Sequence, residues 1–511
     1  MKKKILIALT AASSLALAQV NGEIDSSFAT DGIVAYDNNQ YNDVVGKMVI
    51  GSNGEMYLAG YTSLNGVTDA MVMALKADGT LDGAFGTAGI KQIEYTNGEK
   101  DKFRDLAILP NGKILAVGET GPHLYANQLV AVLNSDGSHY GGFNQSGYLV
   151  NGNSKRDAWN SCVALANGKI LVGGLTSDGG GSNVSISKFN ADGSPDISFN
   201  LTGNLTFDNA ASEQLTDLHE HSATKYYGVI KENTHKVRVM AFNQNGVMDV
   251  TFGNAGSKRI DMAPALEVNP TQVLTDSLGR VYVIGNTIHP NSKYKALVMR
   301  FLSTGELDSN YAINGIFEVN LGSTNANLAQ NAVLLDDGTL LLSGLGAYNN
   351  TPTAITFRVA TDGSLIFNHG QQGVYRYNIT GTTEATALNL AMHPNGSIFG
   401  YCSTDLINQA DFTVIKLKGK VGGLGVNESI VKNTSINAYP NPAQAEINLN
   451  LENFEGELVT INVYTTAGQI LQSWQTNQPG YSLSLGNLST GMYLLTANSP
   501  HKTAQLKFTK K

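Results

Sequence analysis

The sequence predicts an all-β protein: a seven-bladed β-propeller that is closed by an N-terminal clasp strand and followed by a small C-terminal β-sandwich. Three observations predict this architecture. A glycine-containing motif recurs with a period of ~58 residues. The repeat array begins and ends with complementary half-units. The last ~80 residues change to short strands that alternate apolar and polar side chains.

The motif is clearest in "ADGTLDGAFGTAG" at residues 77–89. Similar stretches recur along the chain, and a fixed period of this length is typical of a repeat array. Aligned on the early glycine, the copies are spaced by 53 to 59 residues and fall at Gly22, Gly79, Gly137, Gly193, Gly246, Gly305 and Gly363.

A second motif, as in "PNGKILAVG", runs between these copies. Its glycines are Gly54, Gly112, Gly168, Gly279, Gly338 and Gly396. One gap spans about two periods, so one unit has lost its glycine near "SATKYYGVI" at 222–230, which also makes seven copies. Each unit is predicted to form four short strands, because strand-favouring residues alternate with Asn-Gly and Asp-Gly turns. Four strands repeated radially are the pattern of a propeller blade.

The two ends of the array explain how the ring closes. The chain opens with the second half of a unit and ends the array with the first half of one, at about 385–418. We expect residues 32–37 to add the outer strand to this last blade, because closure removes unpaired strand edges. An open solenoid is the alternative, and it would leave both half-units unpaired.

The core "DG-x-LD-x-x-FG-x-x-G" at 78–89 resembles the delta-60 repeat, a bacterial family named for a spacing of near 60 residues. The resemblance covers about 21–418. Proteins of this family are mostly known as predicted propellers without assigned chemistry. The resemblance therefore implies the fold of residues 19–418 and adds no active site.

A second domain is predicted at 434–511, after a glycine-rich linker at 419–433. Its short alternating strands indicate a β-sandwich. Four motifs resemble the type IX secretion C-terminal sorting domain: "YPNP" (439–442), "VYTTAGQIL" (463–471), "LSTGMYLLTA" (488–497) and "LKFTKK" (506–511). The resemblance implies that the type IX translocon is a partner and that the chain is released or attached to surface lipopolysaccharide. An ordinary C-terminal binding sandwich is the alternative.

The N-terminus carries a predicted secretory signal at 1–18. Three lysines precede an apolar run, and small residues precede Gln19, as a signal peptide requires. The run is too short to span a bilayer, and no other segment approaches ~18 consecutive apolar residues. We therefore expect a monomer without a transmembrane segment, secreted from or attached to the outer membrane of a Gram-negative bacterium.

Net charge limits the expected ligands, and cysteine content limits the expected disulfide bonds. The net charge of −8 disfavours nucleic acid and anionic lipid, because those ligands need clustered Lys and Arg. Only Cys162 and Cys402 are present, and the repeat alignment puts them three blade steps apart. A disulfide needs Cα atoms within about 7 Å, so two free, buried thiols are predicted.

Aspartates recur at one position of the long loop: Asp25, Asp82, Asp196, Asp249 and Asp308. One carboxylate per blade supplies too few oxygens for Ca²⁺. We expect each to cap local backbone N–H groups, while the neighbouring aromatic wedges between blades. These aromatics are Phe28, Phe85, Phe143, Phe199, Phe252, Tyr311 and Phe367.

The degenerate fourth unit contains His219 and His221, with His235 nearby. Residues i and i+2 of a strand share a face, so a metal pair is conceivable. Surface histidines in a decayed repeat are the simpler interpretation, and neither a metal nor a cofactor is predicted. The sequence has no Gly-x-Ser-x-Gly elbow, Walker loop or Cys-x-x-Cys pair.

One arc of the ring combines mixed charge with an aromatic residue. Three aspartates each lie eleven residues before their blade's turn glycine, where the chain enters the innermost strand. The candidate ligand-binding residues at the mouth of the central channel are Asp43, Asp101, Arg104, Arg156, Asp157 and Trp159. The alternative is a solvated rim of loop-starting aspartates. No catalytic residue is assigned.

These observations predict an exported propeller that acts as a binding or scaffold module for a glycan or protein ligand. A secreted hydrolase or lyase, with its active site at the channel mouth, is the alternative. An inward cluster of two or three titratable residues would favour the enzyme, whereas an apolar or uncharged channel would favour the binding module.

Overall fold

The computed structural model describes residues 22–511 except 30, 39–40, 65, 97, 123–124, 153–154, 178–180, 208–211, 291–292, 322–327, 349–350, 378, 380–384, 405–409, 421–431, 434–435, 455–456, 466–469 and 500–501. The expected signal peptide and most of the expected linker lie outside the described residues. The chain divides into two compact units, Met1–Gly422 and Gly423–Lys511.

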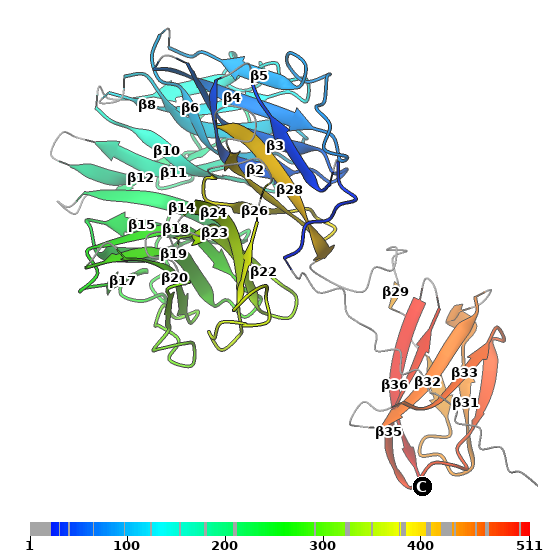
Figure 1. Ribbon diagram of the computed structural model, residues 1–511. Helices are drawn as coiled ribbons and strands as arrows, with labels where there is room; N and C mark the ends of the chain where they lie inside the picture. Colours follow the sequence, from blue (N-terminus) through cyan, green and yellow to red (C-terminus); the bar gives the residue numbers. More distant parts are fainter. Residues whose placement is uncertain are drawn as a thin grey trace, which may run out of the picture. The chain divides into compact units, whose positions relative to one another are not determined.

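The first unit contains seven antiparallel four-stranded sheets within the described residues (Figure 1). We number them by their first strands, which are β2 (Asn42–Ile50), β6 (Lys102–Ile108), β10 (Ala158–Ala164), β14 (Glu213–Ser222), β18 (Glu267–Thr275), β22 (Leu328–Leu334) and β26 (Asn389–Met392). The second strands are β3 (Met56–Leu64), β7 (Ile114–Thr120), β11 (Ile170–Ser177), β15 (Lys225–Glu232), β19 (Val281–His289), β23 (Leu340–Tyr348) and β27 (Ser397–Thr404).

The remaining two strands complete each sheet. The third strands are β4 (Val67–Leu75), β8 (Asn127–Leu133), β12 (Ser182–Phe189), β16 (Lys236–Phe242), β20 (Lys293–Phe301), β24 (Thr351–Val359) and β28 (Asp411–Lys420). The fourth strands are β5 (Ile90–Ile93), β9 (Tyr148–Asn151), β13 (Asn204–Phe207), β17 (Ser257–Asp261), β21 (Ile316–Val319), β25 (Val374–Arg376) and, for the last sheet, β1 (Ile33–Tyr36).

The sheets form a closed ring. Each first strand contacts the first strand of the next sheet, and β26 contacts β2. Figure 1 shows the strands of the last sheet beside the blue strands of the first. The first strands are therefore innermost, and buried apolar clusters fill the spaces between neighbouring sheets. The all-β propeller fold is as the sequence predicts.

The N-terminal strand completes the last sheet. β1 pairs with β28 in antiparallel register, with Ile33 opposite Ile415 and Tyr36 opposite Phe412. A further bridge joins Ile24 to Leu417. The two ends of the array thus share one sheet, in the order β1-β28-β27-β26.

The predicted aromatic wedges are present in six of seven cases. Phe28, Phe85, Phe143, Phe199, Phe252 and Tyr311 are all buried. A Cβ at Gly79, whose φ is +87°, would lie 2.8 Å from the Phe28 ring, so glycine lets the ring pack beneath the next loop. The prediction for Phe367 is wrong, because its side chain is 72% exposed. His369 is buried instead, because it occupies the loop position that Phe85 holds in "LDGAFG".

The predicted capping role of the loop aspartates is confirmed. Each of the five accepts a hydrogen bond from the backbone N–H two residues further on, as in the 3.0 Å bond from Thr251 to Asp249. The cysteine prediction is also confirmed, since Cys162 and Cys402 are free and buried. Burial raises the pKa of the Cys402 thiol to about 12.

The second unit is a two-sheet sandwich. Its five-stranded sheet contains β29 (Lys432–Asn433), β36 (Lys502–Lys510), β35 (Gly491–Asn498), β32 (Val459–Thr465) and β33 (Ile470–Thr476). Its three-stranded sheet contains β30 (Asn437–Tyr439), β31 (Glu446–Asn450) and β34 (Gly480–Ser484), and a short 3-10 helix, η1, spans Glu452–Phe454. Both sheets contribute to one buried core, as Ile447 and Leu495 illustrate.

Candidate functional site

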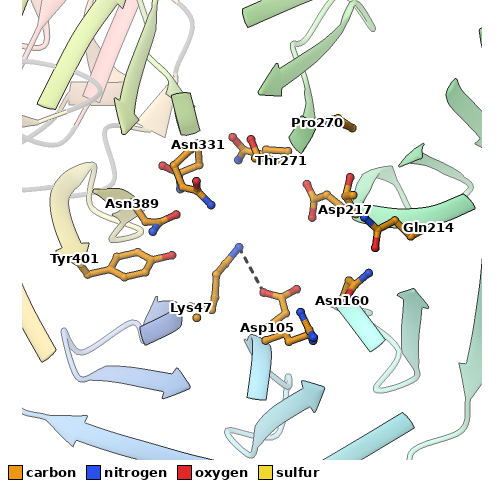
Figure 2. Close-up of a pocket in the computed structure, with 15 residues that line it drawn as sticks. Lys47, Asp105, Asn160, Gln214, Asp217, Pro270, Thr271, Asn331, Asn389 and Tyr401 are labelled. Carbon is orange, nitrogen blue, oxygen red and sulfur yellow. Dashed lines mark ion pairs between the residues drawn. The ribbon is translucent and has the colours of Figure 1, made fainter. Parts of the chain in front are cut away.

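A polar cavity of about 320 Å³ lies in the central channel (Figure 2). The innermost strand of every sheet contributes to its wall, and Tyr401 of β27 adds one aromatic side chain. Its lining residues are Gly46, Lys47, Arg104, Asp105, Asn160, Gln214, Thr216, Asp217, Pro270, Thr271, Gln272, Gln330, Asn331, Asn389 and Tyr401. The wall is thus built mainly from amides, hydroxyls and a few charged groups.

A repeated β-bulge shapes this wall. In six of the seven innermost strands the register shifts by one residue at the same place, and in the last sheet the same shift falls just before β26, between Ala385 and Asn389. A bulge leaves one residue unpaired and re-aims the side chains around it. The bulged residues are Gly46, Arg104, Asn160, Thr216, Thr271 and Gln330, and all six line the cavity.

In five of the six bulged strands, the residue after the bulge joins its sheet to the next one. Asp105 Oδ2 accepts a 2.8 Å hydrogen bond from the backbone N–H of Cys162. The same arrangement recurs around the ring, with acceptor side chains on Ser161, Asp217, Gln272 and Asn331 and donors on Leu218, Val273, Ala332 and Leu390. These side chains satisfy backbone groups that would otherwise be unpaired between sheets.

Lys47 occupies this position in β2 and breaks the pattern, because an ammonium group has no acceptor. Its Nζ lies 3.5 Å from Asp105 Oδ1, and its side chain is 37% exposed. Figure 2 shows the Lys47 amine pointing into the cavity toward the Asp105 carboxylate. The negative charge of Asp105 raises the pKa of Lys47, so the lysine stays protonated.

Asp217 is a cavity carboxylate whose pKa is raised toward neutral pH. Burial raises its pKa to about 6, the charge of Asp105 acts in the same direction, and Lys47 opposes them. Its oxygens accept hydrogen bonds from Ser161 Oγ at 2.9 Å and from the backbone N–H of Val273 at 2.9 Å. Asp217 therefore holds the next sheet through a hydrogen bond, and its raised pKa lets it gain or lose a proton near pH 6.

Three other lining side chains differ in whether they already hydrogen-bond to another residue of the protein. Arg104 Nη2 donates a 2.8 Å hydrogen bond to Glu119 Oε1, so its charge is compensated within the protein. In the described part of the chain, the side chains of Gln214 and Gln330 make no hydrogen bond to another residue. These two amides are therefore available to a ligand.

Among the six predicted site residues, Arg104 lines the cavity and the three aspartates do not. Asp43, Asp101 and Asp157 are at most 2% exposed, so a solvated rim is the wrong description of them. Asp157 accepts hydrogen bonds from Thr176 Oγ1 and from the backbone N–H of Ser177, at 2.7 and 3.0 Å. Such bonds fasten the start of the innermost strand to the end of the second strand.

The other two predicted residues lie apart from one another. Trp159 is 1% exposed and belongs to the apolar cluster between the second and third sheets. Arg156 is exposed and lines a different cleft. The structure does not bring the six residues together, and their joint role in ligand binding stays a prediction.

Only two of the three histidines, His219 and His221, approach a common atom. His219 Nε2 and His221 Nδ1 both lie 2.9 Å from Thr275 Oγ1, whereas His235 pairs with Asp261. The described residues contain no group of three or more His, Cys, Asp or Glu placed to hold a metal ion.

Comparisons with known families agree with the two units. Residues 437–511 match the model of the secretion system C-terminal sorting domain. Residues 51–85 and 165–199 match the model described as a domain of unknown function (DUF5122) beta-propeller. The chain is a β-propeller protein with a secretion sorting domain, and its sorting domain makes it a secreted or cell-surface protein. Within the described residues, no helix has the length and apolar character needed to cross a membrane.

Solved structures with a similar fold are distant in sequence. A protein of unknown function from Dyadobacter fermentans DSM 18053 is 14% identical, with a TM-score of 0.41, and the match covers 76% of this chain and 100% of that one. The polysaccharide lyase Uly1 is 9% identical, with a TM-score of 0.43 and coverage of 77% and 92%. Sqt1 from Chaetomium thermophilum is 10% identical, with a TM-score of 0.39 and coverage of 78% and 98%. None of the curated proteins matches this chain, and similarities at this level carry no information about activity.

Proposed function

We propose that the protein is a secreted or cell-surface binding module, and that its central cavity binds a hydroxyl-rich ligand such as a unit of a glycan. The observation that carries this proposal is the amide-rich wall, which all seven sheets build. An amide side chain both donates and accepts hydrogen bonds, so it suits sugar hydroxyls. Gln214 and Gln330 support the proposal most directly, because their amides have no hydrogen-bonding partner within the described residues.

Binding explains the wall better than catalysis does, because the carboxylates already have structural roles. Asp105 and Asp217 accept backbone N–H groups of the next sheet. Gln272 and Asn331 do the same at the equivalent positions without a titratable group. The structural role therefore explains why a carboxylate occurs at this position, without a catalytic role.

A glycan array probed with the purified protein tests the proposal, with Gln330→Ala and Gln244→Ala as a matched pair. Gln330 faces the cavity, whereas Gln244 lies in a loop outside it. We expect wild type and the Gln244 variant to bind the same glycans. The Gln330 variant should bind them about two- to tenfold more weakly, the range for one lost neutral hydrogen bond. Equal affinity of all three proteins would contradict the proposal.

A secreted hydrolase or lyase is the second candidate, and one observation favours it. Lys47, Asp105 and Asp217 form the inward titratable cluster expected for an enzyme, and the pKa of Asp217 is raised to about 6. The test is product formation from each bound glycan between pH 5 and 8. The binding proposal expects no product; turnover that Asp217→Asn abolishes would establish the enzyme instead.

Delivery by the type IX translocon and a monomeric state belong to the same proposal. The match of residues 437–511 to the sorting domain and their separate core support this route. Removing 434–511 should leave the propeller folded inside the cell envelope, because the two units have separate cores. Normal levels of the truncated protein in the medium would contradict the route.

A further inference from the structure

A second cleft, of about 770 Å³, lies between the third and fourth sheets. It is lined by the ends of β11 and β15, the start of β12 and the residues around the start of β14. Gln214 of β14 lines both this cleft and the central cavity. Gln214 thus borders both spaces, and its side-chain amide has no hydrogen-bonding partner within the described residues.

Among the described residues that line the cleft, the charges are compensated with one exception. Lys231 Nζ lies 2.5 Å from both Glu267 Oε1 and Asn269 Oδ1. The Glu213 carboxylate is 1% exposed and forms an ion pair with Arg238. Arg156 is exposed and makes no ion pair within the described residues. Its guanidinium therefore supplies an uncompensated positive charge to the cleft.

The rest of the lining is small and polar. Ser177, Ser182 and Ser212 place hydroxyl groups on both sides of the cleft, and the Oγ atoms of Ser182 and Ser212 lie 2.9 Å apart. Leu175 is the one large apolar residue among the described lining residues, and it is only 5% exposed. This surface offers hydroxyl partners but no apolar pocket for peptide side chains, so a glycan fits it better than a peptide does.

We propose that the central cavity and this cleft bind successive units of a linear acidic oligosaccharide, with Arg156 as the specificity-determining residue for its anionic group. This inference rests on the proposed glycan-binding function and names the class of glycan. The planar fork of an arginine pairs with a carboxylate or a sulfate through two parallel hydrogen bonds. Gln214 then contacts the ligand where it passes from the cavity into the cleft.

The test uses the full protein and an array of linear tetra- to hexasaccharides in uronic acid, sulfated and carboxyl-reduced forms. We expect wild type to bind an anionic form about tenfold or more tightly than its neutral counterpart, the effect of one charge-assisted hydrogen-bond pair. Arg156→Gln should remove this preference and leave affinity for the neutral form unchanged. Arg156→Lys should keep part of the preference, because it keeps the charge and loses the fork. Lys76→Gln, which removes one exposed charge outside the cleft, should keep all of it.

The outcomes separate this inference from the function on which it rests. If Gln330→Ala weakens binding while Arg156→Gln leaves the anionic preference intact, the cavity is a glycan site and the cleft assignment is wrong. If wild type binds no oligosaccharide, both are wrong. An acidic peptide, such as oligoglutamate, that binds as tightly as the acidic oligosaccharides and depends equally on Arg156 would also overturn the inference.

Discussion

Asp43 lies at the junction between the last sheet and the first, and it is fully buried. Burial raises its pKa to about 7, and the nearby Asp411 and Asp37 carboxylates act in the same direction. The nearby Thr62 hydroxyl and a 3.1 Å hydrogen bond from the backbone N–H of Asn38 oppose this rise. The neutral acid is thus the form that this junction prefers below neutral pH.

The raised pKa of Asp43 predicts a pH-dependent stability. The folded protein keeps a proton that the unfolded chain releases near pH 4, so the stabilisation is complete below that pH and is lost as the pH rises through 7. We expect Asp43→Asn, which stays neutral, to reduce the loss of unfolding free energy between pH 5 and 8. The difference should be on the order of 2–4 kcal/mol. Urea titrations at both pH values measure it, and an identical pH dependence of wild type and variant would contradict the assignment.

Asn331 predicts a second effect at the scale of one residue. Its side chain accepts a 2.8 Å hydrogen bond from the backbone N–H of Leu390 and donates a 2.9 Å bond to the Leu390 carbonyl. Asn331→Ala leaves both buried groups unpaired, and we expect it to lower the unfolding free energy by about 1–3 kcal/mol. The neighbouring Gln330→Ala is the control, and it should change stability by less than about 0.5 kcal/mol. Equal effects of the two substitutions in urea would show that the bonds to Leu390 do not join the sheets.

At this scale the sequence predicts only part of the site. The same position at the start of the first three innermost strands holds Asp43, Asp101 and Asp157, and the spacing correctly marks them as equivalent. Each of these aspartates is followed nineteen residues later by a threonine at the end of the second strand. Their burial could not be predicted, because only the fold brings each threonine next to its aspartate. The residues that follow the bulges could not be predicted, because these equivalent positions hold Lys, Asp, Ser, Gln and Asn, which share no motif. Their common role appears only when each meets a backbone N–H of the following sheet.

The bulges of the innermost strands determine which residues face the channel. Opposite five of the six lies a glycine of the second strand: Gly60, Gly118, Gly174, Gly285 and Gly344. A Cβ on any of them would collide with a carbonyl oxygen of the bulged strand. Cys402 takes the aligned position in the last sheet, where the register also shifts by one residue between the pairs Ala385–Thr404 and Asn389–Tyr401. The glycine repeat that marks the end of the second strand thus accompanies the bulge in five sheets, and the fourth and last sheets shift register without it.

This contact predicts that replacing such a glycine by alanine lowers the unfolding free energy. In Gly118→Ala the new methyl group would meet the Lys102 carbonyl of β6, which is backbone and cannot turn away. We expect a loss of unfolding free energy of about 2 kcal/mol or more. Gly83→Ala is the matched control, because a Cβ there meets nothing within 4 Å. A Gly118 variant with wild-type stability in thermal or urea unfolding would contradict the proposed link between glycine and bulge.

For the elements themselves, the sequence predicts the fold class well. Strands between glycine turns, grouped in fours, are visible in the second repeat at 103–109, 113–118, 128–134 and 147–151, close to β6 through β9. The fourth sheet keeps its hairpin between β14 and β15 although its glycine is lost. Phe367 shows the limit of this prediction. The aromatic residue of this loop is exposed, whereas the buried position two residues further on holds His369.

At the scale of the whole molecule, closure of the ring depends on its N-terminal segment. β1 supplies the outer strand of the last sheet, and Phe28 of the preceding loop packs against Phe399 of β27. Deleting residues 19–37 removes both and exposes the edge of β28. We expect a large loss of thermal stability, or aggregation, beyond the usual effect of trimming a terminus. A truncated protein that melts within a degree or two of the parent would contradict closure by this strand.

We propose that the cavity built by all seven innermost strands is the ligand site. Equilibrium binding of an array-selected glycan to Gln330→Trp tests this proposal, because the indole would fill much of a cavity of about 320 Å³. Gln330 is a bulged residue and its side chain makes no hydrogen bond within the described part of the chain, so the fold should tolerate the change. We predict that the variant melts close to wild type and binds no glycan at concentrations that saturate the parent. Wild-type affinity in a folded Gln330→Trp protein would show that the ligand binds elsewhere.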